Sequence, residues 1–155
     1  MRTVFIASGD SLHGDAVAVH RVLELLGHPP NVGMYDVPEL TIKLAEDIAA
    51  AKEVVFVHPE QQLGEPWVEP MPYLEQEEVP VSNPLNPAGL LNLARALYEF
   101  RGKGYICHVP GLDFSVESEM SSYAENRAHQ AAVLLERFLR GPHRALLARS
   151  AADAA

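Results

Sequence analysis

Two short stretches hold most of the side chains that could do chemistry. The first, Ser8-Gly9-Asp10-Ser11-Leu12-His13-Gly14-Asp15, supplies carboxylates, an imidazole and hydroxyls. The second contains His58 and Glu60, two positions apart. Each stretch directly follows a short apolar run, so each is expected to form a loop at the end of a buried strand. Ligands of parallel α/β sheets bind at the carboxyl ends of the strands, which makes these loops the first candidates for a site.

The elements that must position these loops alternate along the chain. Four apolar runs have the composition of buried strands, at residues 3–7, 31–35, 53–57 and 105–109. Four stretches have helical apolar spacing, at residues 16–26, 38–51, 88–100 and 118–139. The proline-rich residues 66–73 suit an edge strand, and residues 75–87 are expected to be a loop.

This alternation predicts a three-layer α/β/α domain with a mostly parallel, mixed sheet of about five strands. We expect residues 1–140 to form a single domain. The tail at 141–155 has little apolar material to bury and is expected to be loosely ordered.

The charge balance excludes some classes of partner. The 155 residues include 12 Lys+Arg against 21 Asp+Glu, a formal net charge of −9. Nucleic acid and anionic membrane surfaces are therefore not expected partners, whereas an acidic cleft could attract a basic peptide or a metal cation. The single cysteine, Cys107, lies in an apolar run and is expected to be a small buried side chain. With no disulfide and no signal peptide in view, the expected location is the cytoplasm.

Gly9-Asp10-Ser11-Leu12 resembles the signature of the GDSL esterases and lipases, in which Ser11 would be the nucleophile. That chemistry requires a base held by a third group. The later Gly-x-Asn-Asp and Asp-x-x-His blocks of that family are absent from this sequence. His129 has the wrong spacing to replace them, and it falls within a predicted helix.

A second resemblance covers about residues 3–139. The first loop is similar to the Gly-Asn-x-Leu-x-Gly-Asp-Asp-Gly-Val-Gly loop of the hydrogenase maturation proteases. Further similar blocks follow in the family's order, at residues 39–46, 54–57, 87–98 and 114–122. The resemblance implies that family's fold. It also implies an endopeptidase that removes a C-terminal extension from the large subunit of a hydrogenase after nickel has been inserted.

The resemblance further implies a nickel-recognising set of one acidic residue, one Asp and one His. The acidic position is Asp15 if the first loop has lost one acidic residue relative to the family pattern, and Ala16 if the two loops are aligned without a gap. The Asp position is His58. The His position falls in residues 82–87, which contain no histidine. Asp15 and His58 are the predicted metal contacts, with His13 and Glu60 nearby, and this donor set suits nickel or zinc.

Three functions stay open. An active protease would use Asp15, with Asp10 or Glu60 helping to activate water, and would hold no permanent cofactor. A degenerate relative would bind a hydrogenase large subunit or a related protein and cleave nothing. An esterase would depend on Ser11. The run Glu75-Gln76-Glu77-Glu78 could meet a basic segment of a partner, and His108 is expected to be a packed or capping residue.

Overall fold

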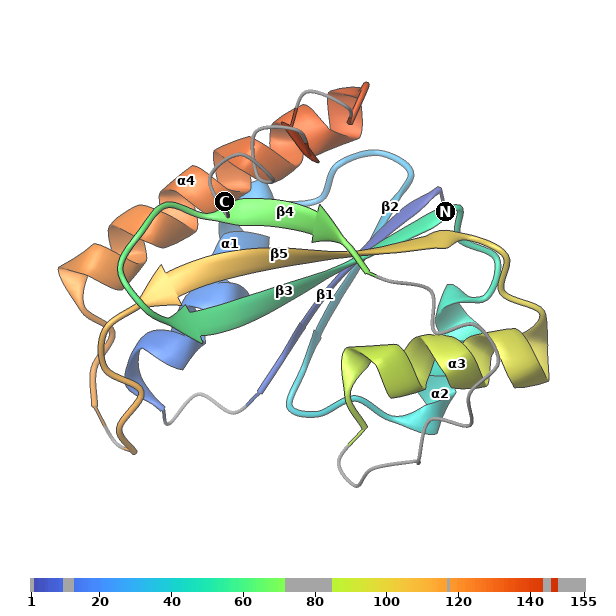
Figure 1. The fold of residues 1–155 in the computed structure, drawn as a ribbon, viewed down its shortest axis with the longest axis horizontal. Helices are drawn as coiled ribbons and strands as arrows, with labels where there is room; N and C mark the ends of the chain where they lie inside the picture. Colours follow the sequence, from blue (N-terminus) through green and yellow to red (C-terminus); the bar gives the residue numbers. More distant parts are fainter. Residues whose placement is uncertain (1, 10–12, 72–84, 117, 144–145, 148–155) are drawn as a thin grey trace.

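The computed structural model describes residues 2–9, 13–71, 85–116, 118–143 and 146–147 (Figure 1). Within these residues one sheet has the strand order β2-β1-β3-β5-β4. Its strands are β1 (Thr3–Ser8), β2 (Val32–Val37), β3 (Glu53–Gln61), β4 (Trp67–Pro70) and β5 (Lys103–Gly111). All neighbouring pairs are parallel except β4 with β5. The proline-rich segment is thus an edge strand, as expected.

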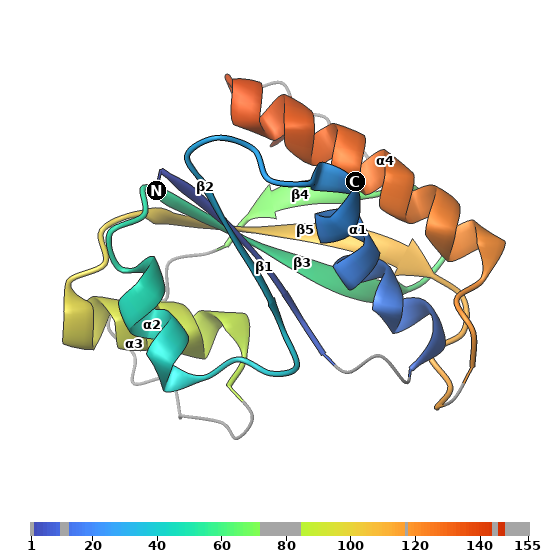
Figure 2. The ribbon, with the colours of Figure 1, turned by 180° about the vertical axis from the view of Figure 1, so that it is seen from behind.

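Helices lie on both faces of this sheet. One face is covered by α1 (Ala18–Leu26) and α4 (Ser122–Arg140), which Figure 2 shows side by side. The other face carries α2 (Ile42–Ile48) and α3 (Pro87–Tyr98). A short 3-10 helix, η1 (Gly14–Val17), leads into α1. The predicted three-layer fold with a mostly parallel, mixed sheet is confirmed.

Alternate residues of the central strands pack into two separate cores. Phe5, Val55 and Tyr105 belong to the core beneath α1 and α4. Val4 and Val54 belong to the core beneath α2 and α3. Because successive side chains of a strand point to opposite faces, a strand covered on both faces must be apolar throughout. The uninterrupted apolar runs of β1 and β3 meet this requirement.

Two of the predicted boundaries were wrong. The helix expected over 38–51 is limited to Ile42–Ile48. The segment before it is held at the end of β1, because the backbone carbonyls of Val37 and Pro38 both accept hydrogen bonds from the Gly9 N–H. In addition, β3 does not end at residue 57 as expected but runs on to Gln61. Its pairing with β1 stops at Val57, whereas its pairing with β5 continues to Gln61 and Gly111.

The extension of β3 beyond β1 sets the position of the site. Residues 58–61 of β3 pair with residues 108–111 of β5. His58 and Glu60 therefore project from a paired strand and not from a loop. Their two-residue spacing places both side chains on one face of the sheet.

Other expectations about individual residues can be compared with the structure. Cys107 is buried, and burial raises the pKa of its thiol to about 12, so it is the small inert side chain that was expected. None of the described helices is long and apolar enough to cross a membrane. The predicted domain limit at 140 stays a prediction. His143, just beyond it, bonds to Glu53 at 2.8 Å, and residues 148–155 lie outside the described part of the chain.

Candidate functional site

A pocket of about 360 Å³ opens at the carboxyl ends of β1 and β3. This volume lies at the lower end of the range for small-molecule sites. Its floor is apolar and includes Ile6, Leu40 and Phe56. The side chains able to form polar contacts come from the two stretches that the sequence singles out: Ser8, His13 and His58.

Asp15 is a buried anchor beside this pocket. Its Oδ2 accepts hydrogen bonds from the backbone N–H groups of Leu112 (2.7 Å) and Asp113 (3.1 Å). The backbone N–H of Ser121 donates to its Oδ1 at 2.7 Å, and the Ser121 hydroxyl donates to its Oδ2 at 2.9 Å. Burial alone would raise the pKa of Asp15, but these hydrogen bonds outweigh burial and lower it. The ionised carboxylate therefore fixes the loop between β5 and α4.

Two glycines make room for this arrangement. A Cβ at Gly111 would lie 2.7 Å from the Cβ of Asp15. A Cβ at Gly14 would lie 2.4 Å from the carbonyl oxygen of Asp113, and Gly14 also has a positive φ of 53°. Ser121 completes the anchor, because its hydroxyl also accepts a hydrogen bond from the Ala124 N–H and caps α4.

His58 stands at the mouth of the pocket with about half of its side chain exposed. Partial burial lowers its pKa, and His108 adds to this effect while Glu60 opposes it. His58 is therefore neutral at pH 7 and keeps a lone pair on one ring nitrogen. Its Nε2 lies 3.9 Å from Oε1 of Glu60, which is close enough for electrostatic attraction but too long for a hydrogen bond.

His108 lies between two carboxylates. Its Nδ1 is 2.5 Å from Glu60 Oε1 and its Nε2 is 2.8 Å from Glu69 Oε1. An ionised carboxylate can only accept, so both ring nitrogens must carry protons for both hydrogen bonds to form. The ring of His108 also stacks on Trp67, with ring centroids 4.3 Å apart. We call Glu60, Trp67, Glu69 and His108 the histidine clamp; it joins β3, β5 and the edge strand β4.

Of the residues that the sequence placed at one metal site, His13 and His58 line the pocket and Asp15 does not. Ala16, not Asp15, lines the pocket with His58, and the carboxylate of Asp15 is occupied by its four hydrogen bonds. Asp10 and Ser11 lie outside the described residues, as do residues 75–78 and 82–84. Among the described residues, no group of three or more His, Cys, Asp or Glu side chains could hold a metal ion. Metal contact by Asp15 and His58 therefore stays a prediction.

Sequence reasoning missed the histidine clamp. His108 was expected to be a packed or capping side chain, and the roles of Trp67 and Glu69 were not anticipated. The contacts depend on the antiparallel register that sets Trp67 opposite His108, and on the parallel register that sets His58 beside it. The two-residue spacing of His58 and Glu60 was the only local signal in the sequence. It indicates side chains on one face of a strand only if β3 extends beyond Val57.

No family model matches this sequence, and no curated protein is significantly similar to it. Among solved structures, the hydrogenase maturating endopeptidase HybD from E. coli aligns over 90% of this chain and 93% of its own, at 20% identity and TM-score 0.70. The NiFe hydrogenase maturation protease HycI from Thermococcus kodakarensis KOD1 aligns over the same shares, at 21% identity and TM-score 0.70.

A third structure, the maturation protease HybD from Thermococcus kodakarensis, aligns over 89% of this chain and 99% of its own, at 18% identity and TM-score 0.64. The similarity spans nearly the whole length of each protein. At such low identity it establishes a shared fold and carries no activity by itself. The resemblance to hydrogenase maturation proteases is therefore confirmed at the level of the fold.

Proposed function

We propose that this protein is a hydrogenase-maturation-protease-like endopeptidase. Its substrate would be the large subunit of a nickel-loaded hydrogenase, from which it removes a C-terminal extension. The observation that carries the proposal is the fold shared over 90% of the chain with the E. coli endopeptidase, together with a pocket at the carboxyl ends of β1 and β3. Such a protein would work in the cytoplasm, since its single cysteine cannot form an internal disulfide.

His58 is the residue best suited to meet a metal ion held by the substrate. Its neutral imidazole is exposed at the pocket mouth, and neutral imidazole is a common ligand of nickel and zinc. The protein would hold no permanent cofactor, because the metal arrives with the substrate. Asp15 would contribute by fixing the loop between β5 and α4. Asp10 and Glu60 are the proposed groups for activating water.

The direct test incubates the purified protein with a large subunit that retains its extension, with and without nickel. Mass spectrometry should detect release of a C-terminal peptide only from the nickel-loaded subunit. His58→Ala should reduce the cleavage rate at least about tenfold, since one metal ligand is lost. The matched control is His129→Ala, an exposed histidine on α4. A nickel-loaded subunit that is neither bound nor cleaved would refute the proposal.

A second candidate is a relative that binds the same partner without cleaving it. The observation that favours it is Ala16, a residue without ligand atoms that lines the same pocket as His58. Binding of the large subunit without release of a peptide would support this candidate. The esterase alternative has no support among the described residues. It predicts hydrolysis of a small activated ester that is lost in Ser11→Ala.

A further inference from the structure

Large apolar side chains are exposed on the two loops beside the histidine clamp. Leu63, in the loop after β3, is 74% exposed. Leu112 and Val116, in the loop after β5, are 45% and 63% exposed. The loops adjoin each other, because Gln61 and Gly111 are paired at the ends of their strands. Neighbouring exposed apolar side chains of this size often mark an interaction surface.

These loops are held in place while their apolar side chains stay exposed. The side-chain amide of Gln61 donates to the Leu112 carbonyl at 3.5 Å. The Tyr123 hydroxyl accepts from the Gly64 N–H at 2.8 Å and donates to the Gly64 carbonyl at 3.1 Å. Asp15 fixes the second loop through Leu112, Asp113 and Ser121. A partner would therefore meet a preorganised surface and would lose little affinity to loop ordering.

The two loops themselves carry charge of one sign, and the cation of Arg127 on α4 stacks on Tyr123, which holds the first loop. Residues 58–71 and 110–121 contain no lysine or arginine, but they contain acidic residues, among them Glu65, Asp113 and Glu119. Hydrogen bonds from Ser115 lower the pKa of Asp113, so it is ionised at neutral pH. Glu65 and Glu119 are exposed.

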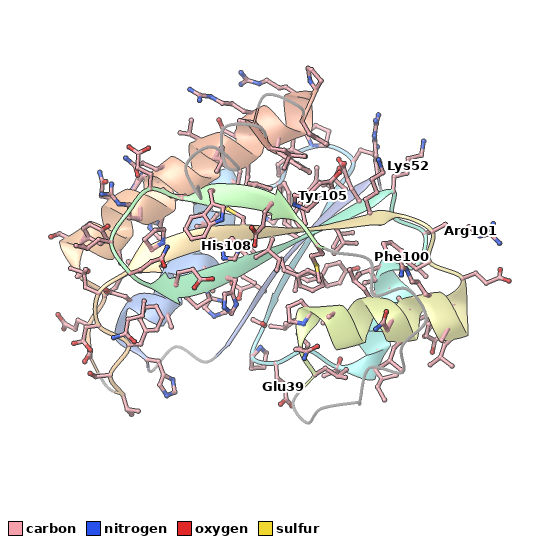
Figure 3. All side chains as sticks on the ribbon, in the orientation of Figure 1. Glu39, Lys52, Phe100, Arg101, Tyr105 and His108 are labelled. Atoms are coloured by element: carbon pink, nitrogen blue, oxygen red, sulfur yellow. The ribbon has the colours of Figure 1, made fainter. Side chains whose placement is uncertain are left out.

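Basic residues gather at the opposite end of the sheet, around Glu53, which bonds to Thr3 and His143. Arg2, Lys52 and Lys103 lie at or next to the first residues of β1, β3 and β5, and Arg101 lies just before β5. In Figure 3, Lys52 and Arg101 lie at the end of the sheet away from the His108 side. Basic residues are thus concentrated at the start of the strands, and the exposed apolar loops with their carboxylates lie at the other end.

We propose that this acidic and apolar surface, formed by Leu63, Glu65, Leu112, Val116 and Glu119, docks a basic and apolar segment of a partner polypeptide. Apolar side chains of the segment would cover the leucines and the valine, and its lysines or arginines would face the carboxylates. The surface lies outside the pocket. The proposal concerns binding alone and does not depend on any cleavage.

The test selects binders from a display library of random peptides. The library is first depleted on the variant Leu63→Ser/Glu65→Lys/Val116→Ser/Glu119→Lys and then selected on the wild-type protein. We expect the enriched peptides to combine Lys or Arg with large apolar residues. Calorimetry on the best peptide should show affinity that falls at least about tenfold in Glu65→Lys/Glu119→Lys, and that also falls with rising salt.

The matched control has the same change of charge at exposed positions away from this surface. Glu46→Lys/Glu136→Lys alters α2 and α4 and should leave the affinity unchanged within about twofold. The proposal would be overturned if the selection enriched acidic peptides. It would also be overturned if no peptide bound the wild-type protein more strongly than the variant used for depletion. A concentration-dependent dimer of the wild type that Glu65→Lys/Glu119→Lys dissociates would overturn it too, because a second copy would then occupy the surface. None of these outcomes depends on a hydrogenase subunit, so failure here is distinguishable from failure of the proposed function.

Discussion

Glu60 Oε1 lies 2.5 Å from Nδ1 of His108, and this pair binds the polar extension of β3 to β5. The second nitrogen of His108 binds Glu69 of the edge strand. One histidine ring thus bonds to carboxylates from two different strands. Removing the ring would leave both carboxylates without their shared donor, in a partly buried site.

We therefore expect His108→Ala to lower the free energy of unfolding by about 1–3 kcal/mol. Urea unfolding followed by circular dichroism would measure it. The control is His129→Ala, which removes an exposed histidine from Glu125 and should cost at most about 0.5 kcal/mol. Equal losses in the two variants would contradict a special role for the clamp.

Asp15 gives a second stability prediction. Its carboxylate accepts three backbone N–H groups and the Ser121 hydroxyl, so Asp15→Ala would leave buried donors without an acceptor. We expect a loss of about 2–4 kcal/mol, because hydrogen bonds to a charged group are stronger than neutral ones. Asp15→Asn keeps the shape but loses the charge and one acceptor, so its loss should be smaller. Hydrogen exchange at Leu112 and Asp113 should rise in both variants.

The lowered pKa of Asp15 also predicts how its stabilisation depends on pH. The unfolded chain takes up a proton near the ordinary value of 3.8, and the folded chain does so only at lower pH. The stabilisation is therefore complete above that ordinary value and is lost as pH falls through the folded pKa. Asp15→Asn should show a smaller loss of stability on acidification than the wild type. Parallel acid-unfolding curves would show that Asp15 does not contribute.

His58 should respond at a higher pH. Partial burial and His108 lower its pKa, against the opposing effect of Glu60, so the folded protein binds a proton at His58 less readily than the unfolded chain. The stability associated with this group is present above the ordinary value of 6.5 and falls as pH drops below it. NMR titration of the imidazole should give a midpoint below 6.5. A midpoint above that value would mean that Glu60 dominates, and Glu60→Gln would then lower it.

The fold was predictable because its evidence is local. Continuous apolar runs such as 53–57 identify strands covered on both faces, and helical apolar spacing identifies the layers that cover them. The edge position of residues 67–70 followed from prolines, which cannot donate to a neighbouring strand. The errors occurred where contacts between residues far apart in the sequence determine the structure. Residues 38–41 were predicted to be helical, but α2 begins only at Ile42, and the Gly9 N–H holds the carbonyls of Val37 and Pro38 at the end of β1.

The site was less predictable because its contacts are non-local. The sequence singled out His58 and Glu60 correctly as neighbours, but it gave no means of bringing His108 and Glu69 to them. Those contacts require the register of three strands, two of which lie far apart in the sequence. It also left Asp15 and Ala16 as alternatives. The backbone path of η1 decides between them, because it directs Asp15 into the loop between β5 and α4 and Ala16 toward the pocket.

That difference between Asp15 and Ala16 leads to the last prediction. Ala16 lines the pocket with His58, so a carboxylate at position 16 would share the pocket with an imidazole. Imidazole and carboxylate together form a donor set suited to zinc and nickel. We expect Ala16→Glu to bind zinc or nickel at least about tenfold more tightly than the wild type, measured by calorimetry with the metal salt. The increase should disappear in Ala16→Glu/His58→Ala.

Ala16→Gln is the matched control, because it has nearly the same shape as Ala16→Glu but no charge. If the glutamine and glutamate variants bound the metal equally, residue 16 would not face His58 in the way that the pocket implies. If the glutamate variant alone gained affinity, residue 16 would be placed so that a carboxylate there binds the metal together with His58. The wild-type chain would then lack a ligand atom at position 16 because it has alanine there.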